Sequence, residues 1–119
     1  MGAEPYQAEM FRSYLVRAYL SFADMSGVWL MNADPVRANL TGTNLTRSFM
    51  NNREAVLDEA NLYEAVLTRA NLCEASLLAA NLSHATFFRA NLSWAGLADA
   101  ITTGAEFTGA DLSNSDLTS

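Results

Sequence analysis

The stretch that decides the fold is residues 60–97, which read ANLYEAVLTRANLCEASLLAANLSHATFFRANLSWAGL. An Ala-Asn-Leu triplet recurs there every ten residues, and a related triplet lies halfway between successive copies. The triplet at 60–62 is followed by Ala-Val-Leu at 65–67, so the underlying period is five residues. Self-similarity at a short fixed period is the sequence signature of a repeat architecture.

The same register extends in both directions and gives 22 repeats. We call the Leu of each triplet the central position and the Ala two residues before it the small position. Leu, Met or Phe occupies 20 of the 22 central positions, with Pro35 and Thr102 as the exceptions, and Ala occupies 17 of the 22 small positions. The register slips once, because the segment 51–54 contains two additional residues. We expect a local bulge at Pro35, and we interpret 51–54 either as a tolerated corner bulge or as a binding loop.

A period of five residues fits neither a regular helix nor a straight strand. Five helical residues advance a side chain by about 140°, so the leucines would be spread around the whole cylinder. In a flat strand an odd period would send successive leucines to opposite faces. If each repeat is a short extended piece followed by a corner, the Ala and Leu side chains of all repeats can point to the same side of the chain. The sequence therefore predicts a solenoid with alanine and leucine inside.

The repeated pattern of a small residue, Asn or Asp, Leu or Phe and two further positions resembles that of the pentapeptide-repeat proteins. This resemblance implies an all-β fold, a right-handed quadrilateral β-helix with four repeats per coil. We expect residues 1–7 to be a leader or cap and residues 8–119 to be a single β-helix with the two-residue insertion near 51–54. The expected core includes Leu62, Leu67, Leu72, Leu77, Leu82, Phe87, Leu92 and Leu97.

Composition excludes several classes of protein. The chain has 119 residues, of which 50% are hydrophobic, and a net charge of −6, so a single folded domain is expected. The single cysteine and single histidine are too few for a disulfide scaffold or a zinc site, and we expect no cofactor and no metal. No arrangement of residues resembles a catalytic motif, and we expect no enzymatic activity. The start of the chain lacks the features of a signal peptide, which favours a cytoplasmic location. We also expect a bacterial protein.

Aromatic residues at outward positions mark the N-terminal repeats. In register, they would face solvent, which predicts an interface. The candidate partner or self-association surface comprises Phe11, Tyr14, Tyr19, Phe22, Trp29 and Phe49. The alternative is an amphipathic capping helix over residues 5–22. We expect a homo-oligomer, formed through these aromatic coils or through the uncapped C-terminal end.

Four repeats per coil would place residues 20 apart, or 22 apart across the insertion, on one edge. Arg47, Arg69 and Arg89 then form a column of like charges. We interpret this column either as an edge that docks an acidic partner or as a solvated edge balanced by nearby acids.

The function that these observations favour is a non-catalytic protein-interaction or scaffold module with an unknown protein partner. The resemblance implies one alternative, a DNA mimic that binds a type II topoisomerase such as DNA gyrase, as in the quinolone-resistance branch of the family. A structural domain of a larger protein is the other alternative. The negative charge disfavours direct nucleic-acid binding, and no apolar segment is long enough to span a membrane as a helix.

Overall fold

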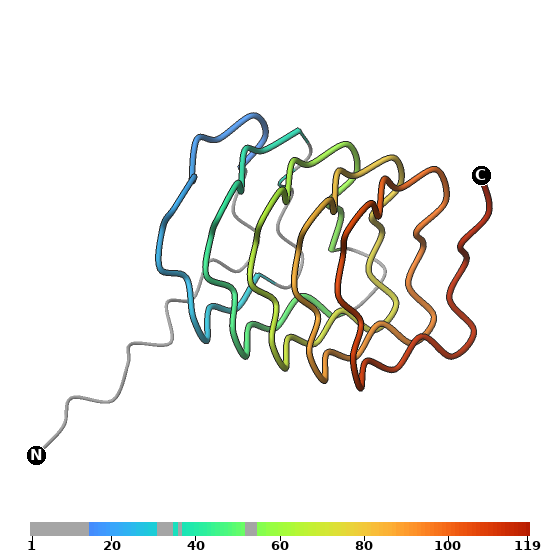
Figure 1. The fold of residues 1–119 in the computed structure, drawn as a ribbon. Helices are drawn as coiled ribbons and strands as arrows, with labels where there is room; N and C mark the ends of the chain where they lie inside the picture. Colours follow the sequence, from blue (N-terminus) through green and yellow to red (C-terminus); the bar gives the residue numbers. More distant parts are fainter. Residues whose placement is uncertain (1–14, 31–34, 36, 52–54) are drawn as a thin grey trace, which may run out of the picture.

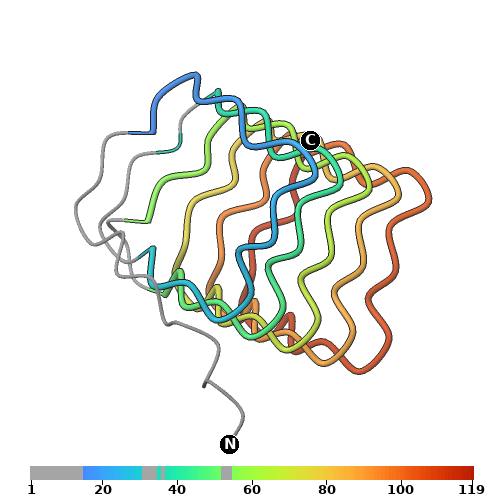
Figure 2. The same cartoon turned by 90° about the vertical axis from the view of Figure 1, so that its left-hand side faces the viewer.

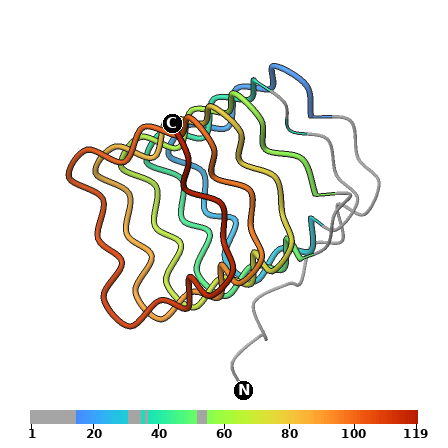
Figure 3. The same cartoon turned by 90° about the vertical axis from the view of Figure 1, so that its right-hand side faces the viewer.

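The computed structural model describes residues 15–30, 35, 37–51 and 55–119, which wind into stacked coils (Figure 1). Within these residues there is no helix, and the regular structure consists of isolated parallel β-bridges. Bridge partners such as Asn61 and Asn81 are 20 residues apart, and successive bridges along one coil are five residues apart. Each coil therefore contains four repeats, and Figures 2 and 3 show the coils stacked in register around a common interior. The chain forms a β-helical solenoid.

A hydrogen-bonded turn ends each repeat whose turn residues the structure describes. In the repeat that begins at Ala60, the N–H of Ala65 donates to the carbonyl of Leu62 at 3.0 Å. We call the two residues between them the first and second turn positions, here Tyr63 and Glu64. All 18 described residues with positive φ, 14 of them not glycine, lie at second turn positions. A four-residue hydrogen bond with positive φ at the third residue is the pattern of a type II turn, and it supplies the corner that a period of five requires.

Hydrogen bonds between coils use the remaining backbone groups of the repeat. In the repeat that begins at Ala60, the N–H of Asn61 donates to the preceding coil, at Ala38. The N–H groups of Leu62 and Glu64 donate to the following coil. All three bonds are 2.8–3.0 Å long. One backbone N–H group of the repeat remains, that of the first turn position, here Tyr63. Its acceptor is the side chain of the residue just before the central position, here Asn61.

That acceptor is the side chain of Asn or Asp in many repeats. The Oδ1 atom of Asn61 accepts the N–H of Tyr63 at 3.1 Å, and Asn81 does the same for Ser83. The amide of Asn81 also donates to Oδ1 of Asn61 at 3.2 Å, which joins two coils. These asparagines are therefore structural, because they satisfy a turn donor and form a ladder along the rod.

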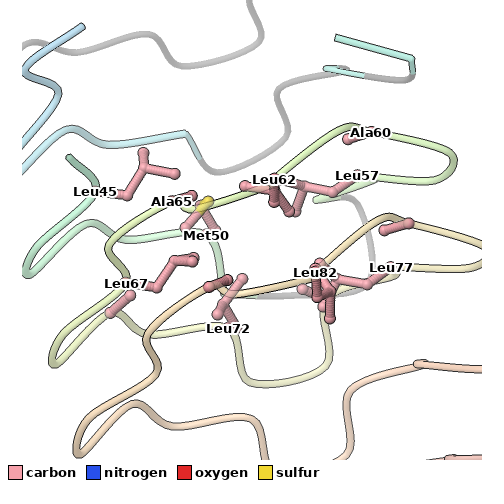
Figure 4. Packing of buried hydrophobic residues seen from close by; sticks show 14 of the residues in the cluster. Leu45, Met50, Leu57, Ala60, Leu62, Ala65, Leu67, Leu72, Leu77 and Leu82 are labelled. Atoms are coloured by element: carbon pink, nitrogen blue, oxygen red, sulfur yellow. The ribbon is translucent and has the colours of Figure 1, made fainter. Parts of the chain in front are cut away.

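The interior is filled by the small and central positions. Every residue of the expected core is at most 2% exposed: Leu62, Leu67, Leu72, Leu77, Leu82, Phe87, Leu92 and Leu97. Figure 4 shows the leucines of successive coils turned into the same interior. Near the C-terminal end the ring of Phe87 stacks on that of Phe107 at 4.9 Å. Burial of each large side chain contributes roughly 1.5–3 kcal/mol before the loss of conformational entropy is counted.

The two irregular places in the sequence affect the pairing differently. Across the segment 51–54 the offset between bridge partners rises from 20 to 22 residues, as in the pair Phe49 and Asn71. Around Pro35 the offset remains 20, and Pro35 itself is buried at its central position. The bulge expected at Pro35 and the loop expected at 51–54 involve residues 31–34, 36 and 52–54, which lie outside the described part of the chain.

The two ends of the solenoid differ in what the structure describes. Residues 15–22 form turns and a bridge rather than a helix, so the capping-helix alternative is wrong for that part of 5–22. Residues 1–14 lie outside the described part. In the last described coil Leu117 is 56% exposed, and Thr102, the polar exception at a central position, is exposed as well. The polar side chain of Thr102 therefore stays in contact with solvent.

None of the described residues forms a helix long and apolar enough to cross a membrane.

Candidate functional site

The arginine column consists of Arg47, Arg69 and Arg89, which occupy the second turn position of the same corner in three consecutive coils. The N–H of Arg47 donates to the carbonyl of Thr68, and the N–H of Arg69 donates to that of Phe88, at 2.9 and 2.8 Å. Their φ angles of 55–57° are nearly identical, so the three side chains leave the backbone in the same way. All three arginines are exposed. The structure therefore aligns three guanidinium groups along one edge of the rod.

The column has no acidic partner in the described part of the chain. Among residues 15–30, 35, 37–51 and 55–119, no ion pair or side-chain hydrogen bond joins an arginine of the column to another residue. Another corner behaves differently, because Nε of Arg37 lies 2.7 Å from Oε2 of Glu59 in the next coil. That contact lowers the pKa of Glu59, first through the hydrogen bond and then through the opposite charge. A carboxylate in the neighbouring coil can thus neutralise a corner arginine, and among the residues that the structure describes the arginine column has none.

Carboxylates near the column stand at its two ends. Asp24 precedes it by one coil, and Glu106 and Asp111 follow it by one coil, on the two faces that meet at this corner. In the coil that contains Arg69, the nearest acidic residues along the chain are Glu64 and Glu74, five residues before and after it. They occupy the preceding and the following corner, so one face of the rod separates each of them from Arg69. The result is a short basic patch about three coils long on an acidic chain.

Apolar side chains flank the arginines. Phe49, Val66 and Phe88 are 39%, 36% and 39% exposed, and each belongs to a different one of the three coils. The guanidinium of Arg89 lies 5.1 Å from the centre of the Phe88 ring, which is within the range of a cation–π contact. The stem of Arg89 also leans over the next corner, where a Cβ atom on Gly109 would lie 3.3 Å from Cγ. The arginines therefore stand beside partly exposed apolar surface.

The predicted aromatic surface is described in part. Tyr19 and Phe22 are 88% and 76% exposed, while Phe11 and Tyr14 lie outside the described residues. Trp29 was expected to face solvent, but it is half-buried, and its ring packs edge-on against Phe49 at 5.7 Å. The rings of Tyr19 and Phe22 are the largest exposed apolar groups of the first described coil.

Three aspartates with a lowered pKa accept hydrogen bonds from their own turns. The N–H of Ser26 lowers the pKa of Asp24, and the Ser113 hydroxyl lowers the pKa of Asp111. Asp116 is affected in the same way by Thr118. These shifts follow from the turn geometry, and none of these carboxyl groups is brought into a catalytic arrangement by it.

His84 and Cys73 lie on different edges of the rod. The imidazole of His84 packs edge-on against Tyr63 at 5.5 Å, and Cys73 accepts a hydrogen bond from the Ser93 hydroxyl at 3.4 Å. Within the described residues, no group of three or more His, Cys, Asp or Glu side chains could hold a metal ion. The contacts of His84 and Cys73 are local packing contacts.

Two features of the surface were missed by the sequence reasoning. It did not place Val66 and Phe88 beside the arginines, although both positions follow from the same offsets of 20 and 22 residues. It also did not find the acceptor for the N–H of Leu78. Position 76, where other repeats have an Asn or Asp acceptor, has Ser, and Asp58 of the preceding coil accepts this hydrogen bond instead. Oδ1 of Asp58 accepts both the N–H of Leu78 and the hydroxyl of Ser76, from the neighbouring coil. Residue type at a turn position gives no signal for such a contact between coils.

The family model described as pentapeptide repeats matches eight copies of the repeat in this chain, at residues 53–87 and 90–119. Among curated proteins, none matches the chain closely enough to be counted as a relative.

Several solved structures are similar to this chain. A pentapeptide repeat protein, Rfr23, from the cyanobacterium Cyanothece 51142 is 31% identical over 76% of this chain, with a TM-score of 0.41. This chain spans 65% of the length of Rfr23. QnrB1, a plasmid-mediated fluoroquinolone resistance protein, is 20% identical over 91% of this chain and 72% of its own, with a TM-score of 0.55.

HetL, a pentapeptide repeat protein involved in heterocyst differentiation regulation in Nostoc sp. strain PCC 7120, is 27% identical over 94% of this chain and 67% of its own, with a TM-score of 0.29. The likeness to QnrB1 concerns the fold alone.

The five-residue register, the turns at the ends of the described repeats and the match to the family model over more than half of the sequence lead to one conclusion. This chain belongs to the pentapeptide-repeat family.

Proposed function

We propose that this chain is a non-catalytic protein-interaction module, which presents columns of side chains on the outside of a β-helical rod. The observation that supports this proposal most directly is the exposed arginine column without a carboxylate partner among the described residues. Coils are about 4.8 Å apart, and two like charges at such a distance repel by roughly 1 kcal/mol in water. Folding gains nothing from that repulsion, whereas a partner that brings negative charge would relieve it.

The packing of the rod is consistent with a function at its surface. The small and central positions fill the interior, so the side chains that vary from repeat to repeat are those that point outward. Three outward positions per repeat are aligned with their equivalents in the next coil by the backbone ladder. A binding surface can therefore be assembled from residues 20 apart in sequence.

The alternative of a DNA mimic that binds a type II topoisomerase is less well supported. A mimic of duplex DNA needs rows of negative charge along the rod, and the middle of this rod carries three arginines on one edge instead. A supercoiling assay with DNA gyrase separates the two proposals. We expect no inhibition of the enzyme and no relief of quinolone poisoning at micromolar concentrations of this chain, and either effect would favour the mimic.

Self-association is a second part of the proposal. Tyr19 and Phe22 expose large rings on the first described coil, and Leu117 exposes apolar surface on the last one. We propose that a second copy covers one of these surfaces, and sedimentation at increasing concentration tests this. A monomer at every concentration would contradict it.

The right-handed winding and the bacterial, cytoplasmic origin stay predictions from sequence. A crystal structure would test the handedness of the winding.

Site-specific photo-crosslinking tests the interaction proposal. A photoreactive amino acid is introduced singly at equivalent second turn positions of the four corners, at Glu64, Arg69, Trp94 and Asp99, which are all exposed. Crosslinking is then carried out in the native host, and products are identified by mass spectrometry. We expect one protein to be crosslinked from one corner, or from two neighbouring corners, and not from the others. Equal products from all four corners, or none from any, would overturn the proposal.

A further inference from the structure

We propose that the arginine column docks an acidic α-helical segment of a partner protein, laid along the axis of the rod. This inference rests on the proposed function and specifies the chemistry of the partner. The contacts would be ion pairs from Arg47, Arg69 and Arg89 to Asp or Glu side chains on one face of the helix. Arginine suits this role because its planar guanidinium binds a carboxylate through two parallel hydrogen bonds.

The spacing of the column favours a helix over an extended segment. Three coils about 4.8 Å apart place the first and third arginine about 10 Å apart along the axis. Helical residues i, i+4 and i+7 span about 10.5 Å, because each residue rises 1.5 Å. Three residues on one side of an extended strand span about 13 Å. The helical spacing departs from that of the column by only about 1 Å, which flexible arginine side chains can absorb.

The apolar neighbours of the column match the other part of such a helix. Phe49, Val66 and Phe88 are each more than a third exposed and belong to the same three coils as the arginines. Val66 lies on the face before the corner, Phe88 at the corner itself and Phe49 on the face after it. A helix that places carboxylates over the guanidinium groups would bring its adjacent residues over these side chains. We therefore infer that the segment is amphipathic, with leucine-like residues on both sides of its acidic stripe.

The ends of the column limit the length of the bound segment. Asp24 lies one coil before the arginines, and Glu106 and Asp111 lie one coil after them. All three of these carboxylates are exposed. A ligand with negative charge along its whole length would be repelled at both ends, whereas about two helical turns of acidic residues would fit between them. This boundary disfavours a nucleic acid, as does the net charge of −6.

Fluorescence anisotropy with a defined probe tests the proposal. The probe is a labelled helical peptide of Ala, Leu and Glu with Glu at i, i+4 and i+7 and Leu beside this stripe. The comparison ligands are the same peptide with Gln in place of Glu, a single-stranded oligonucleotide and a DNA duplex. We expect the Glu peptide to bind at low salt, to bind at least about tenfold more tightly than the Gln peptide, and to weaken as ionic strength rises.

Two double variants locate the binding site. The test variant is Arg69→Gln with Arg89→Gln, and the matched control is Arg17→Gln with Arg37→Gln. All four positions are exposed second turn positions with φ of 55–57°, and both variants remove two positive charges. We expect the test variant to lose about tenfold or more in affinity for the Glu peptide, and the control to stay within about twofold of the unmodified chain.

Each other outcome would overturn the proposal. Equal losses in both double variants would show an effect of net charge alone, and no binding of the Glu peptide at low salt would show that the column does not recognise it. Tighter binding of either DNA than of the peptide would assign the column to a nucleic acid. The crosslinking experiment separates this failure from that of the proposed function, because crosslinks from another corner would leave an interaction module with a different binding edge.

Discussion

Ala79 and Ala98 allow the cost of the left-handed corners to be measured. They lie side by side in consecutive coils, since the N–H of Ala79 donates to the carbonyl of Ala98 at 2.9 Å. Ala79 is at a second turn position with φ of 54°, while Ala98 is at a first turn position and is not among the residues with positive φ. Neither side chain is part of the core. Ala79 is exposed and Ala98 is half-buried, so the main difference between the two glycine substitutions is the backbone conformation that each residue must adopt.

The two substitutions should change stability in opposite directions. The left-handed region costs a residue with a Cβ atom about 1–2 kcal/mol, and Ala79→Gly removes this cost. Either substitution increases the conformational freedom of the unfolded chain, which lowers stability by about 0.4–1 kcal/mol. We expect Ala79→Gly to stabilise the fold by about 0.5–1 kcal/mol and Ala98→Gly to destabilise it by about as much. The contribution of the unfolded chain cancels in the difference, which is about 1–2 kcal/mol.

Urea denaturation followed by circular dichroism measures this difference. With a slope of about 1–2 kcal/mol per molar urea, the midpoints of the two variants should differ by roughly 1 M, with Ala79→Gly higher. Both residues belong to neighbouring coils, so the comparison holds even if the solenoid unfolds in stages. If Ala79→Gly lowers the midpoint as much as Ala98→Gly does, the corners carry no strain and this account of them is wrong.

Three further predictions concern the core, the register and one carboxyl group. Leu77→Ala should lower the free energy of unfolding by about 3–5 kcal/mol, because Leu77 is 0% exposed and the alanine wall cannot collapse into the space; a loss below about 1 kcal/mol in urea denaturation would contradict this. Ser93→Cys should form a disulfide with Cys73 on oxidation, since the Ser93 hydroxyl already lies 3.4 Å from its sulfur, whereas Ser113→Cys, two coils from Cys73, should leave both thiols free in a thiol assay. The pKa of Asp111 should lie below 3.8 by NMR titration and return toward it in Ser113→Ala, because the Ser113 hydroxyl and N–H stabilise the carboxylate; an unchanged midpoint would refute this. Since the folded pKa is the lower one, the contribution of Asp111 to stability is complete above pH 3.8 and is lost as the pH falls through the folded value.

The main features of the fold could be predicted because the period of five residues excludes the other regular backbones. The pairing offsets of 20 and 22 residues follow from four repeats per coil and the insertion at 51–54, and the bridges of Asn61 with Asn39 and Asn81 confirm both. The left-handed corners could not be predicted from residue type. Arg69 and Glu74 have φ near 60°, although neither is a residue that favours positive φ. The hydrogen bonds of the turn and of the ladder impose that conformation, and they depend on the neighbouring coil.

The arginine column shows the same division between what sequence predicts and what it does not. Its alignment was predicted by the register, but the absence of a carboxylate partner among the described residues depends on side-chain geometry across coils. The pair Arg37 and Glu59 shows that an acid 22 residues further along neutralises an arginine at a corner of this fold. At the corresponding step from Arg47, the sequence has Arg69.

The fold itself places no requirement for arginine at these three positions. Besides Arg17 and Arg37, second turn positions at other corners of the rod carry Phe, Glu, Ala, His, Trp, Asp or Gly, with φ of 54–68° and the same N–H bond to the next coil. Any of these residues would complete the turn without stacking like charges at intervals of about 4.8 Å. Neither the turn nor the core requires three successive arginines, and this observation supports our proposal of a partner that supplies the opposite charge.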